Sequence, residues 1–220
     1  MEKLYIWYHT NNLPKGIPAP LETSIVETYN PKKPMQDFNF AWVRYKYMLM
    51  PFPPEDDKLK LPENLSLVMK NEKEPNFDFL NKKSEYKIVS EKLLNILVEN
   101  GLNPNYETAK LTLLNKKGED VSTQPYFLLR FARFDDELFD FNEATKIPSA
   151  IPNTFLYPDF KLKTETDKGV FVLENFCYKD CIIINGKVKA KIEGECYLPE
   201  IYAVKDFPEV FNGQMNAWKK

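Results

Sequence analysis

The segment KIVSEKLLNILVENG, residues 87–101, combines a helix start, a helical hydrophobic period and a helix stop. Ser90 is a favourable N-cap, because its hydroxyl accepts a hydrogen bond from a free backbone N–H of the first helical turn. Gly101 follows the last apolar residues, where a left-handed C-cap is easiest without a Cβ atom. At about 100° per residue the apolar positions cover one broad face: Leu93, Leu94, Ile96, Leu97 and Val98. We therefore predict an amphipathic helix over about residues 90–101 that packs on a hydrophobic core.

Segments typical of β-strands lie on both sides of this helix. Residues 109–114 and 125–134 flank the polar stretch 115–120, which predicts a β-hairpin with its tip at Lys117-Gly118. Residues 126–129 are apolar on both faces, so we expect them in the middle of a sheet with the helix covering one side. Further strands are expected at residues 4–8, 24–29, 38–50, 65–70, 77–80, 169–173 and 200–204, the last of which also suits a short helix.

The Asn185-Gly186 pair lies between two β-branched runs, residues 181–184 and 187–192. Both central positions of a type I′ turn need positive φ, so this pair predicts a two-residue hairpin. Together these elements predict an α+β fold with a largely antiparallel β-sheet and one main helix packed on it. The length of 220 residues suggests a single domain over residues 1–220, with a weak lobe boundary near residues 148–158, where prolines cluster.

Composition indicates a globular protein with no dictated electrostatic partner. The chain has 30 basic and 32 acidic residues, a formal net charge of −2, which argues against nucleic-acid binding. Its first residues lack the apolar core and cleavage site of a secretory signal, and no window approaches the roughly 18 apolar residues of a membrane span. The cysteines are odd in number, so we expect reduced thiols, a cytoplasmic location and no membrane association. They are Cys177, Cys181 and Cys196.

Residues for the common catalytic mechanisms are missing. A single histidine, His9, excludes the usual His-rich metal sites, and the cysteines supply at most three thiolates with an unusual spacing. The seven glycines are isolated from one another, so no phosphate-binding loop is expected. We predict no metal, no cofactor and no catalytic residue, and we expect that the protein is not an enzyme.

The densest charged feature is the acidic segment, residues 135–140, which follows Arg130 and Arg133. Its carboxylates are Asp135, Asp136, Glu137 and Asp140. These groups suit a pair of catalytic carboxylates with separated pKa values, or a surface that faces a basic partner. They equally suit a solvated turn with local Arg–Asp pairs, because exposed charge runs are ordinary.

Three segments in order resemble a known family: residues 86–93 (YKIVSEKL), 125–129 (PYFLL) and 134–140 (FDDELFD). About residues 77–147 resemble the bacterial immunity proteins of polymorphic toxin systems, in particular the immunity protein 43 family. The resemblance implies a protein that stays in the cytosol of the producing cell and blocks a cognate toxin domain encoded by a neighbouring gene. It implies no catalytic residues.

If the toxin has a basic cleft, we expect the carboxylates of the acidic segment to face it and to mimic an anionic substrate. Two other classes of function stay open. One is a small hydrolase or transferase with a carboxylate-based site at residues 135–140, and the other is a non-catalytic adaptor or structural domain. The adjacent gene distinguishes them, because an immunity protein should follow a large secreted protein that ends in a variable toxin domain.

Overall fold

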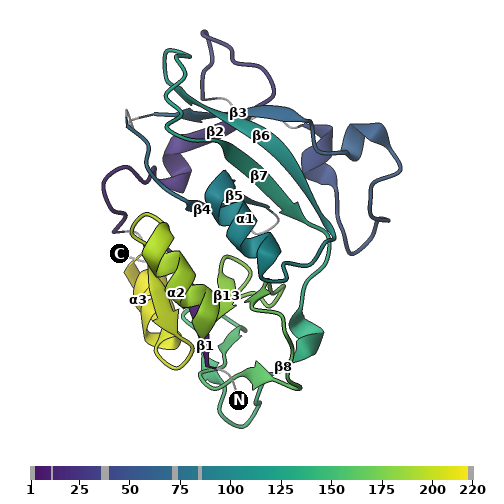
Figure 1. The fold of residues 1–220 in the computed structure, drawn as a ribbon, viewed down its shortest axis with the longest axis vertical. Helices are drawn as coiled ribbons and strands as arrows, with labels where there is room; N and C mark the ends of the chain where they lie inside the picture. The colour runs from purple at the N-terminus through teal and green to yellow at the C-terminus, as the bar shows by residue number, and fades with distance from the viewer. Residues whose placement is uncertain (1–2, 11, 36–39, 71–73, 84–85, 218–220) are drawn as a thin grey trace. The chain divides into compact units, whose positions relative to one another are not determined.

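The computed structural model describes residues 3–10, 12–35, 40–70, 74–83 and 86–217 (Figure 1). Within them the chain forms an α+β fold of mostly antiparallel strands, which confirms the predicted fold class. The described α-helices are α1 (Glu91–Glu99), α2 (Gly186–Glu195) and α3 (Phe207–Ala217). None of the described helices has the length and apolarity that a membrane span requires.

The chain divides into two compact units. The six-strand unit comprises residues 13–95 and 104–133, and the four-strand unit comprises residues 1–12, 96–103 and 134–220. The proline-rich stretch at 148–158 lies inside the four-strand unit, so the division between units does not fall there. That all 220 residues form one domain stays a prediction.

The six-strand unit is built on one sheet with the strand order β2-β3-β6-β7-β5-β4. Neighbouring strands are antiparallel except β3 and β6, which are parallel. Leu128 and Leu129 on β7 have no exposed surface, which confirms the central strand that is apolar on both faces. The elements are β2 (Thr23–Val26), β3 (Asn64–Met69), β4 (Phe79–Lys83), β5 (Tyr86–Ser90), β6 (Tyr106–Asn115), β7 (Tyr126–Phe131) and the 3-10 helices η1 (Pro20–Glu22), η2 (Ala41–Arg44) and η3 (Asp57–Leu59).

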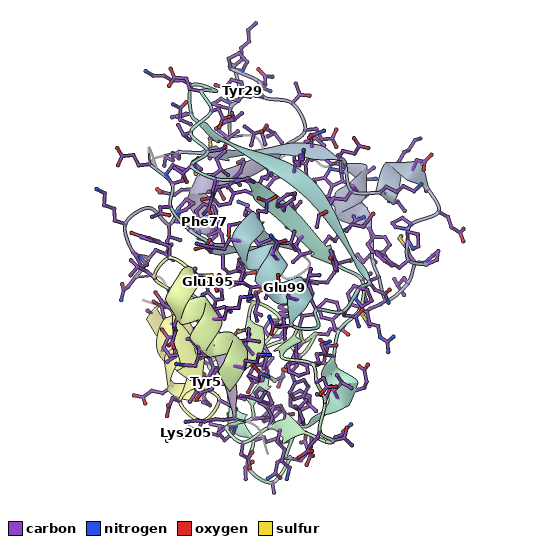
Figure 2. All side chains as sticks on the ribbon, viewed as in Figure 1. Tyr5, Tyr29, Phe77, Glu99, Glu195 and Lys205 are labelled. Atoms are coloured by element: carbon purple, nitrogen blue, oxygen red, sulfur yellow. The ribbon has the colours of Figure 1, made fainter. Side chains whose placement is uncertain are left out.

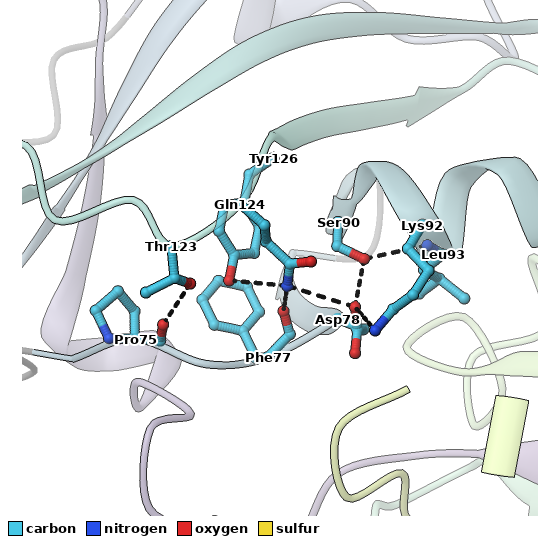
Figure 3. A network of polar contacts seen from close by, with 9 residues as sticks. All are labelled: Pro75, Phe77, Asp78, Ser90, Lys92, Leu93, Thr123, Gln124 and Tyr126. Carbon is cyan, nitrogen blue, oxygen red and sulfur yellow. Dashed lines mark hydrogen bonds and ion pairs between the residues drawn. The ribbon is translucent and has the colours of Figure 1, made fainter. Parts of the chain in front are cut away.

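Helix α1 begins where the sequence predicts, directly after β5. The Ser90 hydroxyl accepts a hydrogen bond from the Leu93 N–H at 3.1 Å and donates to Asp78 Oδ1 at 2.5 Å (Figure 3). Lys92 Nζ lies 3.3 Å from the same carboxylate oxygen. The Gln124 side-chain amide donates to the backbone carbonyl of Phe77, the residue before Asp78, at 3.1 Å. This network holds the helix start against the segment before β4. At the other end Gly101 has φ +88°, as expected for a left-handed C-cap.

The predicted hairpin between β6 and β7 is also confirmed. The two strands pair antiparallel, and Gly118 at the tip has φ +85°. A side chain there would strain the backbone and collide with Tyr29, because an added Cβ would lie 2.4 Å from the ring carbon Cε1. Only glycine fits at residue 118 without strain or a clash.

The four-strand unit contains a sheet in the order β12-β13-β1-β14, with all pairs antiparallel. Its core is aromatic: the Phe139 ring lies edge-on to Phe160 and Phe171, with centroids 5.4 Å and 5.2 Å away. The three cysteines are free thiols and buried. The elements are β1 (Leu4–Trp7), η4 (Asp136–Leu138), β8 (Phe139–Asp140), β9 (Ile147–Pro148), β10 (Phe155–Leu156), β11 (Lys161–Leu162), β12 (Val170–Phe171), β13 (Ile182–Asn185) and β14 (Ile201–Ala203), together with α2 and α3.

The hairpin predicted at Asn185-Gly186 is wrong. Asn185 ends β13 and caps α2, because its side-chain oxygen accepts a hydrogen bond from the Val188 N–H at 2.9 Å. Val188 and Ile192, four residues apart, are buried on one face of α2. Asparagine favours both turns and helix caps, and the helical spacing of these two apolar residues favours the cap.

The strand predicted for residues 38–50 is also wrong in the part that the structure describes, residues 40–50. This part forms η2 and turns. Its backbone groups bond outside any strand ladder: the Trp42 carbonyl accepts from Arg130 Nη1 at 2.7 Å, and the Tyr45 N–H donates back to the same carbonyl oxygen at 3.3 Å. The alternating polar and apolar residues here therefore belong to a loop, which the buried Arg130 holds in place.

Candidate partner-binding site

The acidic segment lies in the four-strand unit, and its first carboxylate points inward. Asp135 is 2% exposed. Its carboxylate accepts hydrogen bonds from Lys168 Nζ at 2.5 Å and from the Val172 N–H at 3.0 Å. Its own N–H donates to the Val172 carbonyl at 2.9 Å. Because a buried charge is stable only when it is paired and hydrogen-bonded, Asp135 holds the chain in place here.

Asp136 organises a neighbouring turn. Its two carboxylate oxygens accept from the backbone N–H groups of Glu174, at 2.7 Å, and Asn175, at 3.0 Å. Partial burial raises the pKa of Asp136, and these backbone hydrogen bonds oppose that rise. The carboxylate thus serves as a cap for a loop that leads into the buried Cys177.

The outward carboxylates of the segment are Glu137 and Asp140, which are both exposed. Asp140 lies 4.0 Å from Lys161 Nζ across the β8–β11 pair, with each side chain about half exposed. The Glu137 carbonyl accepts from Lys163 Nζ at 2.9 Å. The surface beside the segment is therefore of mixed charge. The structure divides the four predicted residues into two that are used within the fold and two that face solvent.

A hollow of about 590 Å³ lies along the same part of the four-strand unit. It is lined by residues 161–167, which carry two lysines, two carboxylates and two threonine hydroxyls. Such a lining offers polar contacts of both signs, as expected of the rim of a protein–protein interface rather than of an apolar ligand pocket.

Arg130 does not form the local Arg–Asp pair that the sequence suggested. It is 3% exposed and belongs to the six-strand unit. Its guanidinium bonds Glu107 through Nε at 2.9 Å and also through Nη2. It donates further to the carbonyls of Trp42 and Leu59 and lies over the Tyr45 ring, 4.6 Å from its centroid. The arginine is a structural tie between the sheet and the loop at 41–60.

The surroundings of His9 and of Cys177 shift the pKa of each side chain. His9 Nε2 accepts a hydrogen bond from Trp7 Nε1 at 3.0 Å. Burial lowers the pKa of His9 to about 4, while the nearby Glu200 works in the opposite direction. Burial also raises the pKa of Cys177, which leaves its thiol protonated. Among the described residues no group of three or more His, Cys, Asp or Glu side chains is placed to hold a metal ion.

Sequence reasoning missed a second hollow, in the six-strand unit. It has a volume of about 410 Å³ and is lined by Glu27, Thr28, Tyr29, Asn30, Pro31 and Phe40. The sequence shows part of this region as a proline-bounded turn but does not show that Phe40, nine residues after Pro31, joins it. The pairing of a carboxylate with two aromatic rings is visible only in the fold.

The comparison with protein families decides the identity of the chain. The model of the family described as immunity protein 43 matches residues 9–218. The chain belongs to the immunity protein 43 family. The match extends the resemblance seen at residues 77–147 to nearly the whole sequence. A comparison with curated proteins finds no match.

For a member of the immunity protein 43 family, the exposed surface is the part of the molecule in which to look for a contact site. A hollow lies in each of the two units. In the four-strand unit Asp140 pairs with Lys161 across β8 and β11, and the Glu137 carbonyl bonds Lys163, so both residues adjoin the lining of that hollow. These surfaces are the candidates for contact with a partner protein.

Proposed function

We propose that this protein binds a cognate bacterial toxin domain stoichiometrically and neutralises it in the cytoplasm of the cell that produces the toxin. The observation that carries the proposal is the family match over residues 9–218. The protein acts by occupying the toxin and does not turn over a substrate. The burial of Cys177 and its raised pKa support a binding role, since a protonated thiol is a poor nucleophile.

The acidic segment is proposed as part of the contact surface. Glu137 and Asp140 meet basic side chains of the toxin, while Asp135 and Asp136 contribute by holding the segment in position through their contacts with residues 168–175. Complementary charge of this kind accelerates association more than it adds affinity, and it weakens as salt rises.

Co-expression tests the binding role. The toxin domain encoded beside this gene should kill cells when expressed alone, should be tolerated together with this protein, and should co-purify with it. Persistent killing despite soluble expression of both proteins would remove the proposal. An excess of toxin over this protein should restore killing, because a stoichiometric inhibitor is exhausted, whereas an enzyme that destroys the toxin is not.

A double variant tests the acidic segment. Glu137→Gln with Asp140→Asn should slow association with the toxin about tenfold at low salt and by less at physiological salt. Glu209→Gln, an exposed carboxylate on α3, serves as the matched control. Association rates that are the same for the double variant, the control and the natural sequence would exclude the acidic segment and leave the binding role standing.

A further inference from the structure

The lining of the hollow in the six-strand unit includes one carboxylate and two aromatic rings. Its lining runs along residues 27–31, directly after β2, and is completed by Phe40. Glu27 is exposed, so its negative charge is available to solvent and to a partner. The volume of about 410 Å³ is ample for a single long side chain.

The carboxylate is fixed in its place before any partner arrives. Glu27 Oε1 accepts a hydrogen bond from Trp42 Nε1 at 2.9 Å, and Trp42 is 3% exposed. The Trp42 backbone is held in turn by the buried guanidinium of Arg130. One carboxylate oxygen is therefore anchored to the interior of the unit, which removes much of the side-chain entropy that a binding partner would otherwise have to overcome.

The two rings are also held. Tyr29 is labelled in Figure 2. Its hydroxyl donates to the Lys116 carbonyl at 2.9 Å, and its ring lies against Gly118 at the hairpin tip. The Phe40 ring stacks on Trp42 with centroids 5.9 Å apart and an interplanar angle of 9°. Both rings are thus positioned by contacts within the unit, as in a preformed recognition site.

Aromatic ring faces and a carboxylate both attract positively charged groups. Ring faces attract cations, and a carboxylate binds the planar guanidinium of arginine through two parallel hydrogen bonds. Arginine suits this hollow better than lysine, because its guanidinium also stacks flat on aromatic rings. We infer that the hollow receives an arginine side chain of the toxin, an inference that rests on the proposed function.

Two lysines near the hollow affect how strongly it attracts a cation from a distance. Lys32 and Lys33 follow the lining residue Pro31 and are exposed. Their charge opposes long-range attraction of a cation, so the selectivity of the hollow must come from close contact with Glu27 and the rings. Variants of Glu27 should accordingly change the dissociation rate of a complex more than its association rate, which separates this site from the acidic segment.

The first experiment uses the free protein and a small probe. N-acetyl-arginine amide is titrated while backbone amide resonances are followed by NMR, with the uncharged N-acetyl-citrulline amide as the comparison probe. We expect saturable shifts at residues 27–30 with the arginine probe and no saturable shifts with the citrulline probe. Equal binding of both probes, or tighter binding of N-acetyl-lysine amide, would overturn the assignment to arginine.

A conservative variant shows whether Glu27 is responsible. Glu27→Gln removes the charge and keeps an acceptor for Trp42 Nε1, so the fold should be retained with an unchanged thermal midpoint. We expect it to weaken binding of the arginine probe about tenfold, the effect of losing one charge-assisted contact. Glu63→Gln, an exposed carboxylate beside β3, is the matched control and should bind as the natural sequence does. Unchanged binding by Glu27→Gln would overturn the inference.

The second experiment uses the toxin domain encoded beside this gene. If the natural sequence binds it and Glu27→Gln dissociates about tenfold faster, the inference holds within the proposed function. If the natural sequence binds and Glu27→Gln dissociates at the same rate, the inference fails and the proposed function stands. If the natural sequence does not bind, the proposed function fails, and the inferred toxin contact fails with it even where the probe titration shows an arginine site.

Discussion

Acidification should destabilise the folded protein through His9, in the window between its ordinary pKa and its folded one. Burial lowers the pKa of His9 from 6.5 to about 4. Between these values the unfolded chain binds a proton on the imidazole while the folded chain keeps it neutral. Stability is therefore fully present above pH 6.5 and is lost as the pH falls toward 4. The chain has no other histidine, so no second imidazole contributes in this window.

The size of the effect follows from the shift. One pKa unit corresponds to about 1.4 kcal/mol, so the shift of His9 predicts a loss of about 2.5 kcal/mol between about pH 7.5 and pH 4.5. Urea unfolding at several pH values measures it. His9→Gln is the matched variant, because glutamine cannot be protonated in this range and still offers an oxygen to Trp7 Nε1. Carboxylates that titrate at the lower end contribute equally to both proteins and cancel in the comparison.

The expected result is a gap between the two proteins that changes with pH. The free energy of unfolding of the natural sequence should fall by about 2.5 kcal/mol more than that of His9→Gln over this range. Parallel pH profiles for the two proteins would refute the reasoning, since they would mean that His9 titrates alike in the folded and unfolded chain. Direct NMR titration of the imidazole provides an independent check on its folded pKa.

Three further substitutions test the packing and the caps by urea unfolding. Leu97→Ala should lower the free energy of unfolding by roughly 2–5 kcal/mol because Leu97 has no exposed surface, whereas Val98→Ala, at 46% exposure, should cost much less; an unchanged midpoint for Leu97→Ala would contradict its burial. Arg130→Met should cost roughly 3–5 kcal/mol by leaving its buried partners unpaired, against about 0.5 kcal/mol or less for the exposed Arg44→Met, and equal costs would deny Arg130 its structural role. Asn185→Ala should cost about 1 kcal/mol if its side chain caps α2, and no loss would argue against the cap.

Local sequence signals predicted the parts of the fold that depend on neighbours in the chain. The cap at Ser90, the left-handed Gly101 and the turn at Gly118 each follow from one residue's conformational preference within a few positions of its partner. The strands on each side of α1 were readable from alternation and β-branched residues. Residues 40–50 were not, because their structure is set by Arg130, which lies about 90 residues away in the sequence.

The candidate site was less predictable for the same reason. A run of acidic residues indicates that charge is present but does not show which carboxylates turn inward. Asp135 finds its partners at Lys168 and Val172, more than 30 residues later, and no local pattern encodes that pairing. The hollow at Glu27 likewise depends on Phe40 coming back to it. At both places, contacts between residues far apart in the sequence determine the arrangement, and the local sequence is compatible with more than one arrangement.

The position of β1 has a consequence for synthesis on the ribosome. Among the described strands it is made first, yet it lies between β13 and β14, so that Leu4 pairs with Asn185 and Tyr5 with Ala203. At typical translation rates the nascent β1 waits roughly 10–40 s for these partners. Every strand of the six-strand sheet has been translated by Phe131. That sheet can therefore assemble on the ribosome while the other one still lacks its last strands, and β1 must avoid pairing with other chains in the meantime.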